Sequence, residues 1–148
     1  RLSRAGQLIA AMRNPDAIPT RAFRMGFTAG PEHIDELGHV NNAVWVQWIQ
    51  SVATSHWAAR ATDEERAAYF WVVVRHEIDY LRALTVGQSV TAHSWVPDTA
   101  KGAKFDRHML FMGADGKPCV AALTTWALID RASGRPMRVP ASLIERFA

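Results

Sequence analysis

Residues 35–42 place a carboxylate, a flexible glycine and the expected start of a helix within one short run. The run reads Asp35-Glu36-Leu37-Gly38-His39-Val40-Asn41-Asn42. A carboxylate in such a turn can act as a general base or as a nucleophile. The unpaired N–H groups at a helix N-terminus can stabilise negative charge on a substrate oxygen. The segment therefore indicates attack on a carbonyl group.

A long helix is expected to position this run. Asn41 and Asn42 are both good N-cap residues, so the helix is predicted to begin at one of them. Apolar residues recur after them at helical spacing and define a buried stripe: Trp45, Trp48, Ile49 and Val52. No Gly or Pro occurs in residues 39–86, which permits a long central helix. A strand over residues 21–29 is predicted before the run, closed by Gly30-Pro31.

Strands are expected to dominate the second half of the chain. Residues 62–65 form a capping box that opens a second, short helix. From Trp71 the apolar period changes to two, which predicts a strand with Arg75, Glu77 and Asp79 on one face. The opposite face is predicted to carry Val72, Val74, His76, Ile78 and Tyr80. Further strands are predicted over 89–96, 103–112 and 118–130, with a hairpin turn at 114–117 and a terminal helix over 140–147. One antiparallel sheet around one helix follows, an α+β fold.

The composition is that of one globular domain. The chain has 148 residues, 49% hydrophobic and 21% charged, and no apolar stretch long enough to span a membrane. Five arginines and one aspartate give residues 1–24 a net charge of +4, against +3 for the whole chain. The body is therefore close to neutral, which argues against a nucleic-acid partner. We expect residues 1–20 to form an N-terminal extension, either a packing helix or a targeting segment, and residues 21–148 to form the domain. The single Cys119 excludes an internal disulfide, predicts a buried unreactive thiol and fits the cytoplasm.

The run from Asp35 to Asn42 resembles the signature of hotdog-fold thioesterases of the 4-hydroxybenzoyl-CoA type. A second stretch, residues 74–82 followed by Gly87, is similar to the second-strand segment of that family. The resemblance spans residues 23–129. It implies a hotdog fold, with about five antiparallel strands wrapped around a long central helix. It also implies hydrolysis of an acyl-CoA without a cofactor, by a homodimer or a dimer of dimers.

The resemblance assigns roles to residues of the run. Asp35 corresponds to the catalytic carboxylate, and the residues do not decide between a nucleophile and a base for water. The backbone N–H of Asn42 is the expected oxyanion donor, and Gly38 lets the loop approach the substrate. His39 either shapes the loop or assists catalysis. The side chain of Asn41 either contacts substrate or only caps the helix.

Five further residues are expected to contact substrate: Trp45, Gln50, His76, Lys101 and Lys104. Gln50 stands where many relatives have Glu or Asp, so it can position a group but cannot act as a base. Trp45 stands where Tyr is commoner, either shaping the acyl pocket or filling the core. His76 is either a hydrogen-bonded core residue or a second catalytic group. Lys101 and Lys104 are expected near the CoA phosphates unless their turn is simply solvated, with Arg82 and Arg107 as weaker candidates.

Three other functions are compatible with parts of this pattern. An acyl-carrier-protein thioesterase carries a similar signature, and the basic N-terminal residues could meet an acidic carrier. A non-catalytic acyl-CoA binding module would share the fold, but Asp35 argues against it. A hydratase needs a His-Asp or His-Glu arrangement that the sequence does not supply. The six histidines show no H-E-x-x-H spacing, so no metal site is expected.

Overall fold

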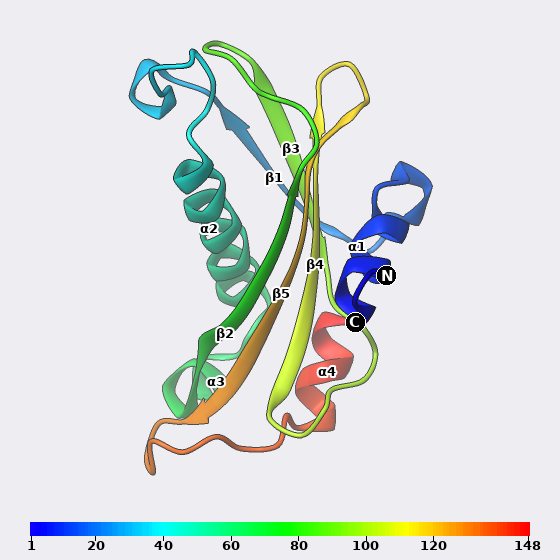
Figure 1. Cartoon of the computed structure of the whole chain (residues 1–148). Helices are drawn as coiled ribbons and strands as arrows, with labels where there is room; N and C mark the ends of the chain where they lie inside the picture. The colour runs from blue at the N-terminus through cyan, green and yellow to red at the C-terminus, as the bar shows by residue number, and fades with distance from the viewer.

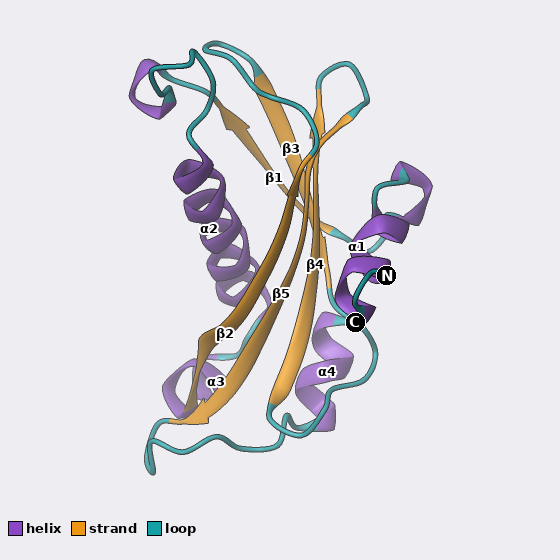
Figure 2. Cartoon of the chain, viewed as in Figure 1, coloured by secondary structure: helices purple, strands orange, loops and turns teal.

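One antiparallel sheet and one long helix contain most of the chain. The computed structural model describes residues 1–148. The strands are β1 (Phe23–Thr28), β2 (Tyr69–Tyr80), β3 (Ser89–Trp95), β4 (Lys104–Gly113) and β5 (Pro118–Asp130), in the spatial order β1-β3-β4-β5-β2. Helix α2 (Asn42–Arg60) lies along one face of this twisted sheet, as Figures 1 and 2 show. This is the predicted α+β hotdog architecture.

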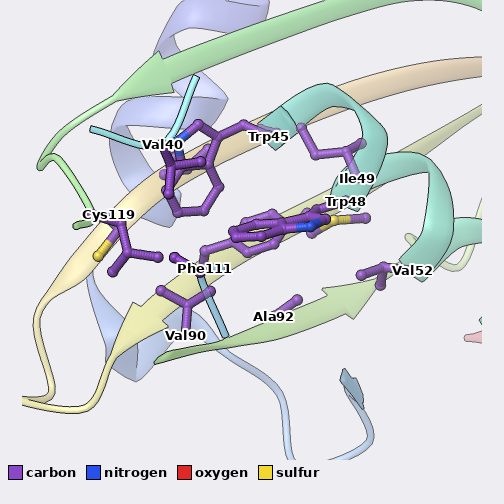
Figure 3. Packing of buried hydrophobic residues seen from close by; sticks show 14 residues of the cluster. Val40, Trp45, Trp48, Ile49, Val52, Val90, Ala92, Phe111 and Cys119 are labelled. Atoms are coloured by element: carbon purple, nitrogen blue, oxygen red, sulfur yellow. The ribbon is translucent and has the colours of Figure 1, made fainter. Parts of the chain in front are cut away.

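The apolar stripe of α2 fills the space between the helix and the sheet. Trp45, Trp48, Ile49 and Val52 are all buried, as the helical spacing predicts. Figure 3 shows these side chains directed toward residues of β3, β4 and β5, among them Phe111. Cys119 lies in the same cluster, which confirms the prediction of a buried thiol, and burial raises its pKa.

The expected faces of β2 are partly wrong because the strand contains a bulge. Its register with β5 shifts between Val73 and Arg75, so Val74 has no partner. The residues that share the helix-facing side of the sheet are therefore Trp71, Val73, His76, Ile78 and Tyr80, not Val72 and Val74. Arg75, Glu77 and Asp79 lie on the outer face, as predicted.

Short helices cover the ends and the outer face of the sheet. Helix α1 (Arg4–Met12) lies against the outer face, opposite α2 (Figure 1), where Ile9 and Met12 pack on Leu110, Ala121 and Leu123. Arg13 then forms an ion pair of 2.5 Å with Asp79. None of the helices combines the length and apolar character that a membrane span needs.

The remaining predicted elements are present within two residues of their expected limits. Thr62 and Glu65 form the predicted capping box of α3 (Asp63–Ala68), and α4 (Ala141–Phe147) follows Pro140. Short 3-10 turns occur at Pro15–Ala17 and Pro31–His33. Phe147 of α4 stacks on Trp57 near the end of α2, with ring centroids 5.7 Å apart. Helix α4 thus closes the space between α2 and the sheet at that end.

Candidate active site

The motif loop, residues 34–40, is a tight turn closed by backbone hydrogen bonds. Ile34 and Val40 form a β-bridge, and the N–H of Asp35 donates to the carbonyl of His39 over 2.9 Å. The N–H of Gly38 donates back to the carbonyl of Asp35 over 3.0 Å. Gly38 has φ +82°, a left-handed conformation that a residue with a Cβ adopts only with strain. The glycine is therefore needed for the turn itself.

The carboxylate of Asp35 is held by one of its two oxygens. Oδ1 accepts hydrogen bonds from the N–H groups of Leu37, at 2.9 Å, and His39, at 3.3 Å. Oδ2 has no hydrogen-bond partner in the chain. The turn-capping role and a chemical role are thus compatible, because each uses a different oxygen. The fixed Oδ1 orients the plane of the group, and Oδ2 stays available as a base or a nucleophile.

The N-terminus of α2 begins directly after the motif loop. The side chain of Asn41 caps the helix, with Oδ1 accepting from the N–H of Ala43 over 2.9 Å. The N–H of Asn41 donates to the carbonyl of His33, which fixes the helix start beside the motif loop. The N–H of Asn42, at the first helical position, has no partner. It therefore remains free to donate to a substrate oxygen, with the helix dipole adding to its effect.

Three other predicted residues have different surroundings. His39 is exposed, and its imidazole makes no hydrogen bond. Trp45 is buried and packs edge-on against Trp48 and Phe111, so it belongs to the core. His76 contacts the hydroxyl of Thr124 through Nδ1 at 2.9 Å, and burial lowers its pKa. The arrangement around His76 matches a hydrogen-bonded histidine held neutral on the helix-facing side of the sheet.

The predicted lysine pair lies at the other end of the sheet from the motif loop. Lys101 and Lys104 form a β-bridge across the turn that leads into β4, of which Lys104 is the first residue, and both are exposed. Strand β4 runs from this turn to Gly113, which pairs with Val90 near the motif-loop end, a distance of about 30 Å at 3.4 Å per residue. Within one chain, the length of β4 thus separates the lysines from the end of the sheet where the motif loop lies.

A pocket of about 200 Å³ opens along the second half of α2. Gln50 and Thr54 contribute to it from the helix, and Trp71, Arg107 and Trp126 contribute from the strands. Of the residues expected to contact substrate, Gln50 lines it, and so does Arg107, a weaker candidate for a CoA phosphate. The residues of the motif loop do not line it.

Arg107 is the buried charged residue of this pocket. Its Nη1 donates to Nδ1 of His56 over 2.7 Å and to the hydroxyl of Ser94 over 2.8 Å. Burial lowers the pKa of Arg107 to about 10, so the guanidinium keeps its charge at neutral pH. Its burial is a correction to the expectation that it meets a CoA phosphate at the surface. Arg82, the other weaker candidate, forms a two-pronged ion pair with Asp115.

Comparison with protein families identifies the family of the chain. The profile of the family described as the thioesterase-like superfamily matches residues 29–147. The chain belongs to the thioesterase-like superfamily. The match includes the motif loop, α2 and all strands after β1. No curated protein sequence matches the chain.

Solved structures share the fold of this superfamily member at low sequence identity. A Staphylococcus aureus protein in complex with CoA has a TM-score of 0.74 and 18% identity, covering 84% of this chain and 80% of its own. A Thermus thermophilus thioesterase complexed with coenzyme A and Zn has a TM-score of 0.73 and 24% identity, over 86% and 91%. An acyl-ACP thioesterase from Bacteroides thetaiotaomicron has a TM-score of 0.75 and 23% identity. The alignment covers 85% of this chain but only 53% of that enzyme, so this chain spans about half of its length.

One feature of the sequence, outside the motif, indicates the buried charge of the Arg107 pocket. In β4, alternation places Arg107 on the same face as Phe105, Met109 and Phe111, all of which are buried. A charged residue within an otherwise apolar face indicates a buried charge. The partners of that charge could not be predicted, since His56 and Ser94 come from other elements.

Proposed function

We propose that this thioesterase-superfamily protein hydrolyses an acyl-CoA to a free carboxylic acid and CoA. The proposal rests on one observation: two groups without hydrogen-bond partners lie in the same hydrogen-bonded segment. Asp35 has an unpartnered carboxylate oxygen, and the first N–H of α2, that of Asn42, has no acceptor. The relatives solved with CoA support this class of substrate.

The chemistry needs few groups because a thiolate leaves readily without prior protonation. In one route Asp35 Oδ2 attacks the thioester carbonyl, CoA leaves as the thiolate, and water hydrolyses the resulting acyl anhydride. In the other route Asp35 takes a proton from water, and the hydroxide adds to the carbonyl. In both, the N–H of Asn42 donates to the oxyanion of the tetrahedral intermediate. Label found in Asp35 after a single turnover in water labelled with oxygen-18 identifies the anhydride route with water attack at the Asp35 carboxyl carbon, because the general-base route leaves both oxygens of Asp35 in place.

Thiol release from a panel of acyl-CoAs tests the proposal. Asp35→Ala is expected to lower the rate at least on the order of 100-fold, as loss of a general base or nucleophile does. Glu36→Ala is the matched control, since it removes the neighbouring exposed carboxylate of the same loop and should leave the rate unchanged. Activity that persists in Asp35→Ala contradicts the assignment. Release from acylated carrier protein but from no acyl-CoA would instead identify a carrier-protein thioesterase.

We also propose that the protein forms a homodimer in which the edge strand β2 of one copy pairs with β2 of the other. This 12-residue strand lies at an edge of the sheet, and Val72, Val73 and Val74 are 40%, 37% and 50% exposed. Free edge strands with exposed apolar residues favour pairing with another chain. A second copy is also the way to bring Lys101 and Lys104 near the motif loop. Sedimentation of the wild-type protein beside Val73→Lys checks this, with a monomer expected only for the variant.

A further inference from the structure

Arg107 is a buried cation without an anionic partner. Arg107 is only 8% exposed, and none of the ion pairs in the chain includes it. Both of its side-chain hydrogen bonds go from Nη1 to neutral acceptors, and Nη2 and Nε make none. A buried charge in this state is costly unless an opposite charge approaches it.

A second hydrogen-bond donor of the same pocket also lacks an acceptor. Nε1 of Trp126 is buried and unpartnered, and Trp126 pairs with Phe105 on the helix-facing side of the sheet. Asp106 also lines the pocket, but its Oδ1 accepts from the hydroxyl of Thr125, and it forms no ion pair with Arg107. Two unsatisfied donors, one of them charged, fit a ligand group that only accepts hydrogen bonds. A carboxylate is such a group, with two oxygens that match a guanidinium.

The place of the pocket along α2 indicates which carboxylate could reach it. Gln50 lies eight residues beyond Asn42, about 12 Å along the helix axis at 1.5 Å per residue. A ten-carbon chain with bonds of roughly 1.5 Å in a zigzag spans about this distance. An acyl group with its thioester at the start of α2 would thus carry its far end into the pocket.

We propose that the Arg107 pocket binds a carboxylate at the far end of the acyl group. The substrate class is then the monothioester of a dicarboxylic acid, an ω-carboxyacyl-CoA. Arg107 and Trp126 determine specificity in this site, and they do not take part in the bond-breaking step. The inference rests on the proposed thioesterase function for its substrate.

Two CoA esters of equal chain length test the pocket: the monothioester of sebacic acid and decanoyl-CoA. The wild-type protein should favour the sebacic ester by about 10-fold or more in kcat/KM, because a hydrogen-bonded charge is gained. Arg107→Met should lower kcat/KM for this ester on the order of 100-fold, as loss of one partner of a buried charge pair does. Turnover of decanoyl-CoA by the same variant should change little. Equal turnover of both esters by the wild type, with equal losses in the variant, overturns the inference and leaves the thioesterase function intact.

Trp126→Phe is the second variant, because it keeps a six-membered aromatic ring and removes the Nε1 donor together with the five-membered ring; turnover of decanoyl-CoA by this variant reports on the lost volume. It should lower kcat/KM for the sebacic ester alone, by about 10-fold. An Arg107→Met protein that dissociates into monomers and loses both activities would show that a partner subunit supplies the anion, which also overturns the inference.

Calorimetry with free sebacate separates failure of the inference from failure of the proposed function. The wild-type protein and Asp35→Ala should both bind sebacate more tightly than decanoate, and Arg107→Met should lose this preference. If no CoA ester is hydrolysed, the thioesterase proposal fails, yet sebacate binding still decides the role of the pocket. Absence of any sebacate binding by the wild type contradicts the proposed role of the Arg107 pocket.

Discussion

Nη1 of Arg107 lies 2.7 Å from Nδ1 of His56, so two groups that can each carry a positive charge share one buried hydrogen bond. A guanidinium can only donate, so Nδ1 must accept. His56 is therefore neutral, with its proton on Nε2. Burial, together with the charges of Arg107 and Arg60, lowers the pKa of His56 to about 3.

This neutral histidine predicts that the protein loses stability in mild acid. In the unfolded chain His56 binds a proton near pH 6.5, whereas in the folded chain it does so only near pH 3. Between these values the unfolded state holds the extra proton, so the free energy of unfolding falls as the pH falls. The slope from this one group is about 1.4 kcal/mol per pH unit between pH 6 and 4. Urea unfolding at a series of pH values measures it.

His56→Asn is the matched variant, because its Oδ1 can accept from Arg107 but does not titrate. Burial also lowers the pKa values of His76, His93 and His108, which add to the total slope in the same direction. The difference between the two proteins isolates His56. The variant should be less stable at pH 7, since it loses the stacking of His56 on Phe23, and less dependent on pH. Parallel curves would show that His56 is already charged in the fold.

The free N–H of Asn42 can be removed without disturbing its helix. Proline is well tolerated at the first helical position and has no N–H. The preceding Asn41 has φ −61° and ψ 140°, which suits a residue before proline. Asn42→Pro is therefore expected to lower kcat on the order of 100-fold, as loss of one oxyanion donor does, with the thermal midpoint nearly unchanged. Asn42→Ala keeps the N–H and should retain most activity; equal losses in both variants would place the role in the side chain.

Gly38→Ala is expected to strain the motif loop. A Cβ at this position meets no other atom, so the cost comes from the backbone alone, at φ +82°. The loss of stability should be about 1 kcal/mol or more, a fall of roughly 3 °C in the thermal midpoint. Gly38→Asn is the control, because asparagine accepts the left-handed conformation more readily. If both variants melt together, the strain has another source.

The packing of α1 predicts unequal effects for two neighbouring residues. Ile9 is 1% exposed and contacts the outer face of the sheet, whereas Leu8 is 38% exposed. Ile9→Ala should lower the free energy of unfolding by about 2 kcal/mol or more. Leu8→Ala should stay within about 1 kcal/mol of the wild type. Denaturant unfolding compares them, and equal small effects would mean that α1 contributes little to the fold.

Local patterns predicted the elements well because each pattern reports on neighbours in the sequence. The stripe of α2, the capping box at Thr62 and the limits of β5 all depend on residues a few positions apart. The bulge at Val74 was missed because three consecutive valines fit either face of a strand. A one-residue shift there moved Val72 off the helix-facing side.

The candidate site was predicted in part for the same reason. Asp35, Gly38 and Asn42 lie in one short run, so their proximity follows from the sequence. Arg107, His56 and Trp126 come from three distant elements, and only packing brings them together. Lys101 and Lys104 were expected near the ligand by resemblance, yet their distance from the motif loop depends on the length of β4, which the motif does not contain.

The anchoring of the motif loop has a consequence for heat inactivation. Val40 donates to the carbonyl of Leu84, in the β2–β3 connection, and Asn41 donates to that of His33. The groups proposed for chemistry are thus tied to the β2–β3 connection through Val40, and the bond between Asn41 and His33 closes the base of the loop. Warming should leave the turnover number rising until the sheet itself melts, so that inactivation and global unfolding occur at one temperature.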